Sequence, residues 1–256
     1  MKIPFSPPDI TEAEIEQVAE ALRSGWITTG PKTKELEREV ADLYGTNRAV
    51  CLNSQTACAE MTLRLLGIHE GDEVITCAYT YTASASVVCH VGAKLVLIDT
   101  QEDSLEMDYN KLAEAITEKT KVIIPVDLGG VPCDYDRIFS IVEEKKKLFH
   151  PANKLQEAIG RVIVMADAAH AFGATWHGKP VGSIADFSNF SFHAVKNLRQ
   201  RKAALWHGEI SKELIMKKSI ISTSCYHFMV SQRMPLPKHS LAPGSMTSSD
   251  LGLNAI

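Results

Sequence analysis

Short apolar runs alternate with helix-like stretches through the first 198 residues, and this alternation constrains the fold more than any other feature of the chain. The runs show no polar alternation and lie at Ala49–Leu52, Glu73–Cys77, Lys94–Asp99, Val122–Val126 and Arg161–Asp167. Helix-like stretches lie between them, near Ala57–Leu66, Ala83–His90, Tyr109–Ile116 and Tyr135–Leu148. Strands that are apolar on both faces are typical of parallel sheets covered by helices. The pattern therefore predicts an α/β fold, a three-layer sandwich around a mostly parallel sheet.

Two further helices are expected before the first apolar run. Thr11 and Glu14 form a capping-box pattern, which marks the start of a helix. The second helix is expected over about Thr33–Leu43. A hairpin is expected at Gly178–Gly182, and Lys145–Gly160 is interpreted as an insertion that lengthens the connection before the last run.

The residues that follow the runs are the candidates for a functional site, because open α/β sheets bind ligands beyond the carboxyl ends of their strands. Ser54 and Thr56 follow the first run and precede a helix, where hydroxyl and amide groups form a phosphate cradle. An equally weighted alternative is that they only cap this helix. Asp167 ends the last run, and Lys196 lies beyond it in the segment FSFHAVKN. Most single lysines are surface residues, but the apolar neighbours of Lys196 argue against that interpretation.

Together these residues supply the parts of a pyridoxal 5'-phosphate site. Such a site needs a lysine that bonds to the cofactor, a carboxylate that keeps the pyridine nitrogen protonated, and an aromatic ring that stacks on the cofactor. It also needs hydroxyl and amide groups that hold the phosphate. The residues for these roles, in this order, are Lys196, Asp167, Tyr81, and the group Ser54, Thr56 and Ser191.

The strings SGWITTGP, LNSQTA, ADAAHAFGA and SFHAVKN resemble the DegT/DnrJ/StrS family of sugar aminotransferases. The resemblance covers residues 3–198 nearly without gaps. It implies the large domain of the fold type I pyridoxal-phosphate enzymes, here incomplete. It also implies a transaminase that moves an amino group, with glutamate as the expected donor, to the keto group of a nucleotide sugar. Such reactions belong to amino-sugar or polysaccharide biosynthesis.

The resemblance also implies roles for individual residues. Lys196 matches the Schiff-base lysine of the family, and Asp167 matches the carboxylate that pairs with the pyridinium nitrogen; these two are the expected catalytic residues. His170 matches a Gln or His that lies close to the cofactor ring. The expected cofactor-binding residues are Ser54, Thr56, Ala57, Tyr81, Asp167, His170, Ser191 and Lys196.

The expected partners are small molecules, a nucleotide sugar and an amino donor. The net charge of −4 argues against a nucleic-acid partner. No apolar run approaches the roughly 18 residues that a membrane span needs, so we expect a cytoplasmic protein. The histidines show no ligand spacing, and no metal site is expected. Members of the family form homodimers; we do not extend this expectation to a chain that departs from the family after Leu198.

The last 58 residues differ in character from the rest. Residues 1–198 carry 19 basic and 28 acidic residues, whereas residues 199–256 carry 8 basic and 3 acidic residues. The family continues after the lysine with N-[LI]-T-T-x-E-G-G, and residues 199–205 can spell TTAEGGA in a reading frame shifted by one base. We therefore interpret 1–198 as a partial cofactor-binding domain and 199–256 as an aberrant or disordered tail produced by a frameshift. The alternative is a divergent native C-terminus.

The frameshift interpretation carries structural and functional expectations. Without the family's C-terminal domain, the sheet should end at an unpaired edge, and residues 199–256 should not pack stably on residues 1–198. A truncated, inactive product that keeps only part of the cofactor cradle is therefore the alternative to an active transaminase. A third hypothesis is a dehydratase of the same fold, but such relatives replace the lysine with His, and Lys196 counts against it.

Overall fold

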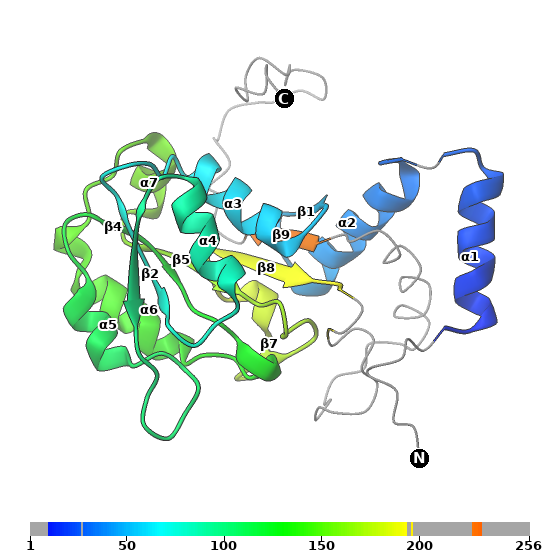
Figure 1. Ribbon diagram of the computed structural model, residues 1–256. Helices are drawn as coiled ribbons and strands as arrows, with labels where there is room; N and C mark the ends of the chain where they lie inside the picture. Colours follow the sequence, from blue (N-terminus) through cyan, green and yellow to red (C-terminus); the bar gives the residue numbers. More distant parts are fainter. Residues whose placement is uncertain (1–9, 27, 194–195, 197–226, 232–256) are drawn as a thin grey trace.

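The computed structural model describes residues 10–26, 28–193 and 196, together with the backbone of 227–231 (Figure 1). Its helices are α1 Glu12–Arg23, α2 Pro31–Tyr44, α3 Gln55–Leu65, α4 Thr82–His90, α5 Tyr109–Ala115, α6 Tyr135–Glu144 and α7 Lys154–Ile159. Its strands are β1 Arg48–Leu52, β2 Glu73–Cys77, β3 Lys94–Ile98, β4 Thr120–Ile124, β5 Ile163–Asp167, β6 Thr175–Trp176, β7 Lys179–Pro180, β8 Phe187–Ser191 and β9 His227–Ser231. Short 3₁₀ turns lie at Leu128–Gly130, Lys146–Leu148 and Val181–Ser183.

A seven-stranded sheet in the order β1-β9-β8-β5-β4-β2-β3 forms the centre of the molecule. The five strands β8, β5, β4, β2 and β3 are parallel to one another, and β9 is antiparallel to both β1 and β8. Since β1 and β8 both oppose β9, β1 runs in the same direction as the five parallel strands. The structure thus confirms the predicted α/β fold with a mostly parallel sheet.

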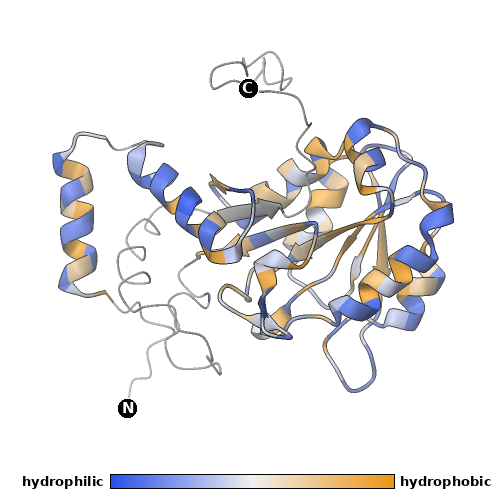
Figure 2. Cartoon of the chain, turned by 180° about the vertical axis from the view of Figure 1, so that it is seen from behind, coloured by the Kyte–Doolittle hydropathy of each residue, from blue (hydrophilic) through white to orange (hydrophobic). Residues whose placement is uncertain are grey.

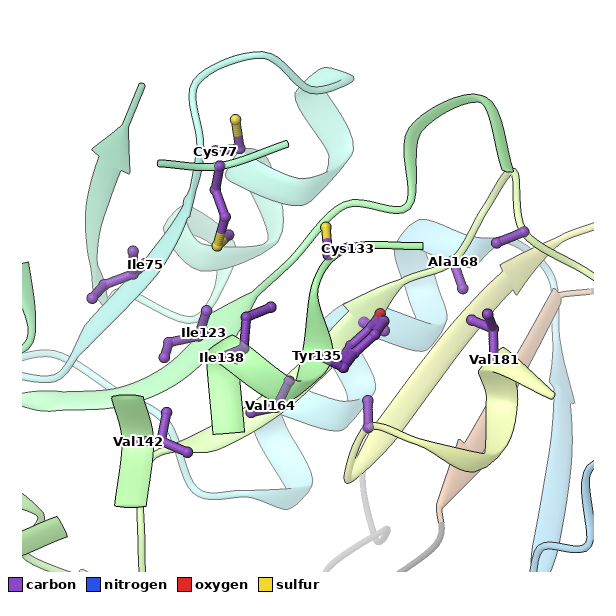
Figure 3. Close-up of a cluster of buried hydrophobic side chains, with 14 of the residues drawn as sticks. Ile75, Cys77, Ile123, Cys133, Tyr135, Ile138, Val142, Val164, Ala168 and Val181 are labelled. Carbon is purple, nitrogen blue, oxygen red and sulfur yellow. The ribbon is translucent and has the colours of Figure 1, made fainter. Parts of the chain in front are cut away.

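The sheet is covered on both faces, because its inner strands alternate their apolar side chains between two cores. In β2, Val74 packs into the core under α3, α4 and α7, whereas Ile75 packs into the core under α2, α5 and α6. In β5, Met165 packs into the same core as Val74, and Val164 packs into the same core as Ile75. Figure 3 shows part of the second core, formed from β2, β4, β5 and α6. This two-sided burial is why the strands contain continuous apolar sequence.

The first helix lies to one side of this sandwich (Figures 1 and 2). Thr11 and Glu14 form the predicted capping box at its start. Its apolar stripe does not enter either core: Ile15 is 51% and Leu22 is 62% exposed. The periodicity therefore predicts the helix correctly, while the burial that normally accompanies an apolar stripe is missing.

Three elements differ from the sequence expectations. The segment interpreted as an insertion contains α7, in which Asn153 caps the helix and Gln156 is fully buried with its amide donating to the Leu66 carbonyl oxygen at 2.8 Å. Strand β8 was not expected, because its sequence FSNFS mixes polar and aromatic residues although all five are buried. The hairpin turns at His177–Gly178, slightly before the expected position.

Strand β9 corrects the expectation of an unpaired sheet edge. Its five residues pair in register with β1 on one side and β8 on the other. Two parallel strands separated by one strand width present unpaired N–H and C=O groups on both sides, which favours any segment that can enter as a strand. The sequence HFMVS contains Phe and Val, which are common in strands. The predicted division at Leu198 stays a prediction, and the helix-forming stretch near 209–220 lies outside the described residues.

Candidate active site

The carboxyl ends of the parallel strands bring the candidate residues to one edge of the sheet. Leu52 at the end of β1 and Ser191 at the end of β8 both pair with His227 of β9, so they lie about 10 Å apart, two strand spacings. Asp167 ends β5, the neighbour of β8, and Tyr81 follows the end of β2. The structure therefore places the candidate residues at one edge, in the order in which the sheet presents its strands.

Lys196 and His170 meet at the centre of this edge. The Nζ atom of Lys196 lies 2.5 Å from Nε2 of His170. Burial lowers the pKa of Lys196, and the charge of Asp167 partly opposes this shift. Burial also lowers the pKa of His170, with a further contribution from the positive charge of Lys196. Both side chains are therefore shifted toward their neutral forms.

The hydrogen bonds of His170 determine how it contacts the lysine. The backbone N–H of Gly129 donates to Nδ1 of His170 at 3.1 Å, so Nδ1 carries a lone pair. In a neutral imidazole the proton is then on Nε2. Nε2–H donates to Lys196 Nζ, which must accept through its own lone pair. This geometry favours the neutral amine of Lys196, the form in which a lysine is a nucleophile.

Asp167 is held by groups from two elements. Ser84 Oγ of α4 donates to Asp167 Oδ2 at 2.6 Å, and the backbone N–H of Ala169 donates to Oδ1 at 3.2 Å. Asp167 is only 6% exposed, and burial raises its pKa above the usual value for an aspartate. The two donors lower it again, as do His170 and Lys196 whenever they carry a positive charge. The site thus contains a buried carboxyl group close to two basic side chains.

The predicted phosphate cradle is less specific than the lysine site. Ser54 Oγ accepts a hydrogen bond from the backbone N–H of Ala57 at 3.0 Å, which is the capping role that the sequence left open. Capping does not exclude phosphate binding, since Thr56 lies in the first turn of α3, where N–H groups have no partner within the helix. Ser191 is buried at the end of β8, and Tyr81 is 76% exposed at the start of α4.

Sequence reasoning missed two residues of this region. Ser84 gave no signal, because its contact with Asp167 joins positions 83 residues apart. Asp127 follows the β4 run directly and was available to the same carboxyl-end rule that identified Asp167. It is fully buried, and its backbone N–H donates to the carbonyl oxygen of Asp167 at 3.0 Å.

Two other kinds of feature are absent from the residues that the structure describes. Within this part of the chain, no group of three or more His, Cys, Asp or Glu side chains is arranged to hold a metal ion. Over the same residues, no helix combines the length and apolar character of a membrane span.

Comparison with known proteins gives a consistent result. The DegT/DnrJ/EryC1/StrS aminotransferase family matches residues 8–202. The spore coat polysaccharide biosynthesis protein SpsC of Bacillus subtilis is 39% identical over 196 residues, which are 77% of this chain and 46% of that protein. The UDP-4-amino-4-deoxy-L-arabinose–oxoglutarate aminotransferase of Shewanella sediminis is 38% identical over 204 residues, 80% of this chain and 48% of that protein.

A solved structure shows the same relation. Spr1654 of Streptococcus pneumoniae, described as a sugar aminotransferase and solved in a PLP form, is 51% identical to this chain with a TM-score of 0.81. The likeness covers 92% of this chain and 54% of that one. The chain thus spans about half the length of the relatives that it matches.

Proposed function

Because the chain belongs to the DegT/DnrJ/EryC1/StrS aminotransferase family, we propose that it is built to transfer an amino group from glutamate to the keto group of a nucleotide-linked sugar, with pyridoxal 5'-phosphate as cofactor. The proposal draws on the names of the relatives, one of which is an oxoglutarate aminotransferase of a nucleotide sugar. The observation that carries it in this chain is the contact of Lys196 with His170 beside the buried carboxyl group of Asp167.

The donor set fits the cofactor. Pyridoxal phosphate needs an amine that can give up its proton, and the 2.5 Å contact with His170 and the lowered pKa of Lys196 both favour the neutral amine. It needs an anionic partner for its ring nitrogen, and Asp167 accepts hydrogen bonds from two donors that favour its ionised form. It needs a phosphate site, which the first turn of α3 and the hydroxyl group of Ser191 can form.

The residues divide the work as follows. Bound pyridoxal phosphate supplies the electron sink that makes removal of a proton from the substrate carbon feasible. Lys196 holds the cofactor and moves that proton at its Nζ atom. Asp167 would keep a proton on the ring nitrogen, and Ser84 orients Asp167 through its bond to Oδ2. Tyr81 would contact the ring, and Ser54, Thr56, Ala57 and Ser191 would hold the phosphate.

The second candidate function is a chain that binds the cofactor but does not turn over. It is favoured by one observation, that the chain spans about half the length of its relatives. In this second candidate, the chain would bind the cofactor through Lys196 but would not react with the sugar.

Covalent capture of the cofactor tests the proposal. The 256-residue chain is mixed with pyridoxal phosphate, reduced with borohydride and digested, and the modified lysine is located by mass spectrometry. We expect the adduct on Lys196 in the wild type and none on this peptide in Lys196→Ala or Lys196→Arg. Lys146→Ala, which changes an exposed lysine paired with Glu143, is the matched control and should behave as the wild type.

The outcomes separate the two functions. In the unreduced complex, a loss of visible absorbance on addition of glutamate and its recovery on addition of a nucleotide-linked keto sugar support the transaminase. Capture of the cofactor on Lys196 without recovery by the sugar supports the non-catalytic chain. Equal labelling of many lysines in a folded wild-type chain, with no preference for Lys196, would contradict both.

A further inference from the structure

A short turn between β4 and α6 is closed by one buried carboxyl group. We call residues 127–133 the Asp127 turn. Asp127 Oδ1 accepts a hydrogen bond from the backbone N–H of Cys133 at 3.0 Å, and Tyr135 donates its hydroxyl to the same carboxyl group, 3.0 Å from each oxygen. Asp127 and Tyr135 are almost completely buried. The carboxyl group therefore joins the beginning of the turn to its end and to the first residue of α6.

The middle of the turn reaches the site. Gly129 has a φ of +64°, in the left-handed region, and its N–H donates to Nδ1 of His170. A side chain at this position would strain the backbone, so glycine permits the turn to aim its amide at the imidazole. The backbone N–H of Asp127 donates to the Asp167 carbonyl oxygen at the other end of the same segment.

We propose that Asp127 is a positioning residue: by closing the turn it aims the Gly129 amide at His170, and so keeps the Nε2–H of that histidine directed at Lys196. Loss of this amide removes the hydrogen bond that favours the Nε2–H tautomer of neutral His170. The tautomer with a proton on Nδ1 presents a bare Nε2 to the lysine, which then favours the protonated ammonium form. Asp127 thus acts on Lys196 through two hydrogen bonds, from Gly129 to His170 and from His170 to Lys196, and its side chain does not contact Lys196 itself.

The role depends on hydrogen bonding and not on negative charge. Burial raises the pKa of Asp127, the bonds from Cys133 and Tyr135 lower it, and the nearby charge of Asp167 raises it, so that together they bring the pKa to about 7. Around neutral pH the group is therefore partly protonated, and an asparagine amide is a close replacement. Asp127→Asn keeps an oxygen that accepts from Cys133. Leucine has a similar size but accepts no hydrogen bond, so Asp127→Leu leaves the backbone N–H of Cys133 and the hydroxyl of Tyr135 unpaired.

Nitrogen NMR of the cofactor-free chain tests the proposal. Chain labelled with ¹⁵N-histidine reports the tautomer of each ring, and His170→Gln identifies the His170 signals. We expect the Nε2–H form in the wild type and in Asp127→Asn, and a mixture of tautomers in Asp127→Leu. The matched control is Asp134→Ala, which removes the N-cap of α6 next to the turn but leaves the Asp127 bonds intact. It should destabilise the helix and leave the His170 tautomer unchanged.

The reactivity of Lys196 gives a second readout. Its modification by an amine reagent at pH 7 should fall about tenfold in Asp127→Leu, the effect of one unit of pKa. Asp127→Asn and Asp134→Ala should react at the wild-type rate. If Asp127→Leu does not fold, Tyr135→Phe, which removes one of the two donors, should show a smaller change in the same direction.

Two results would overturn the proposal. One is a folded Asp127→Leu with the wild-type tautomer and reactivity. The other is a loss in Asp127→Asn equal to that in Asp127→Leu, which would assign the role to charge. The inference rests on the proposed function only for the importance of Lys196. Because both readouts use cofactor-free chain, they can fail while cofactor capture succeeds, and the reverse also holds.

Discussion

Replacement of Asp186 by Asn should destabilise the chain strongly, because it breaks a buried ion pair at the beginning of β5. Arg161 donates to Asp186 through two nitrogens, at 2.7 and 2.9 Å, and the backbone N–H of Val164 donates to the same carboxylate at 2.9 Å. The side chains of Arg161 and Asp186 are 3% and 1% exposed. The pair thus holds the strand whose far end carries Asp167.

The size of the effect follows from what remains after the change. Removing one partner of a buried pair costs about 3–5 kcal/mol, because the other charge stays buried without compensation. Glu143, which is half exposed, lies 3.4 Å from Nε of Arg161 and compensates part of that charge. We therefore expect a loss near the lower limit, about 3 kcal/mol, a large fraction of the roughly 5–15 kcal/mol by which domains are stable.

Urea unfolding of the cofactor-free chain measures this loss, with an unchanged m-value as the sign that only stability has changed. The double variant Arg161→Met, Asp186→Leu should be more stable than either single variant, since it leaves no buried charge. Glu16→Gln is the control. It breaks an exposed pair with Arg23, whose side chains are 68% and 70% exposed, and should cost less than about 1 kcal/mol. A loss below about 1 kcal/mol in Asp186→Asn, or a double variant as unstable as the two singles combined, would refute the reasoning.

Three further predictions concern the site, the packing around it and the tail. Ser84→Ala removes a hydrogen-bond donor to Asp167 and raises the pKa of Asp167 further. A carboxyl group with a raised pKa gives stability that is present at acid pH and lost as pH rises. In urea unfolding the variant should therefore cost about 1.5–3 kcal/mol at pH 7 and clearly less at pH 4. Equal costs at both pH values would show that Asp167 is not ionised. Gly182→Ala places a methyl group 2.7 Å from the Tyr44 ring and should cost about 1–3 kcal/mol in the same assay, whereas a neutral change would mean that the ring moves away freely. Hydrogen exchange should protect the amides of β9 and leave the remainder of 199–256 unprotected; strong protection throughout Ile220–Pro243 would end the frameshift interpretation.

Much of the fold was accessible from the sequence because its signals are local. Continuous apolar runs predicted β1 to β5. In the inner strands β2, β4 and β5 all five residues are buried, and a strand buried on both faces has no polar side to interrupt the run. The capping box predicted the start of α1 for the same reason, because its two hydrogen bonds join residues three apart. Strand β8 was missed because its Asn189 and two serines make the segment look polar. These residues are buried by tertiary neighbours, which a local sequence pattern does not reveal.

Within the candidate site, the sequence by itself determined which chemistry is present. Lys196 and Asp167 were identified from residue types in a recognisable order, and the tertiary structure added their partners. Ser84, Gly129 and Asp127 contact the site only because α4 and the Asp127 turn converge on the sheet edge, across separations of tens of residues. Protonation followed the same division. A lysine has an ordinary pKa in the unfolded chain, and burial beside His170 lowers the pKa of Lys196 because desolvation acts through surroundings that folding alone creates.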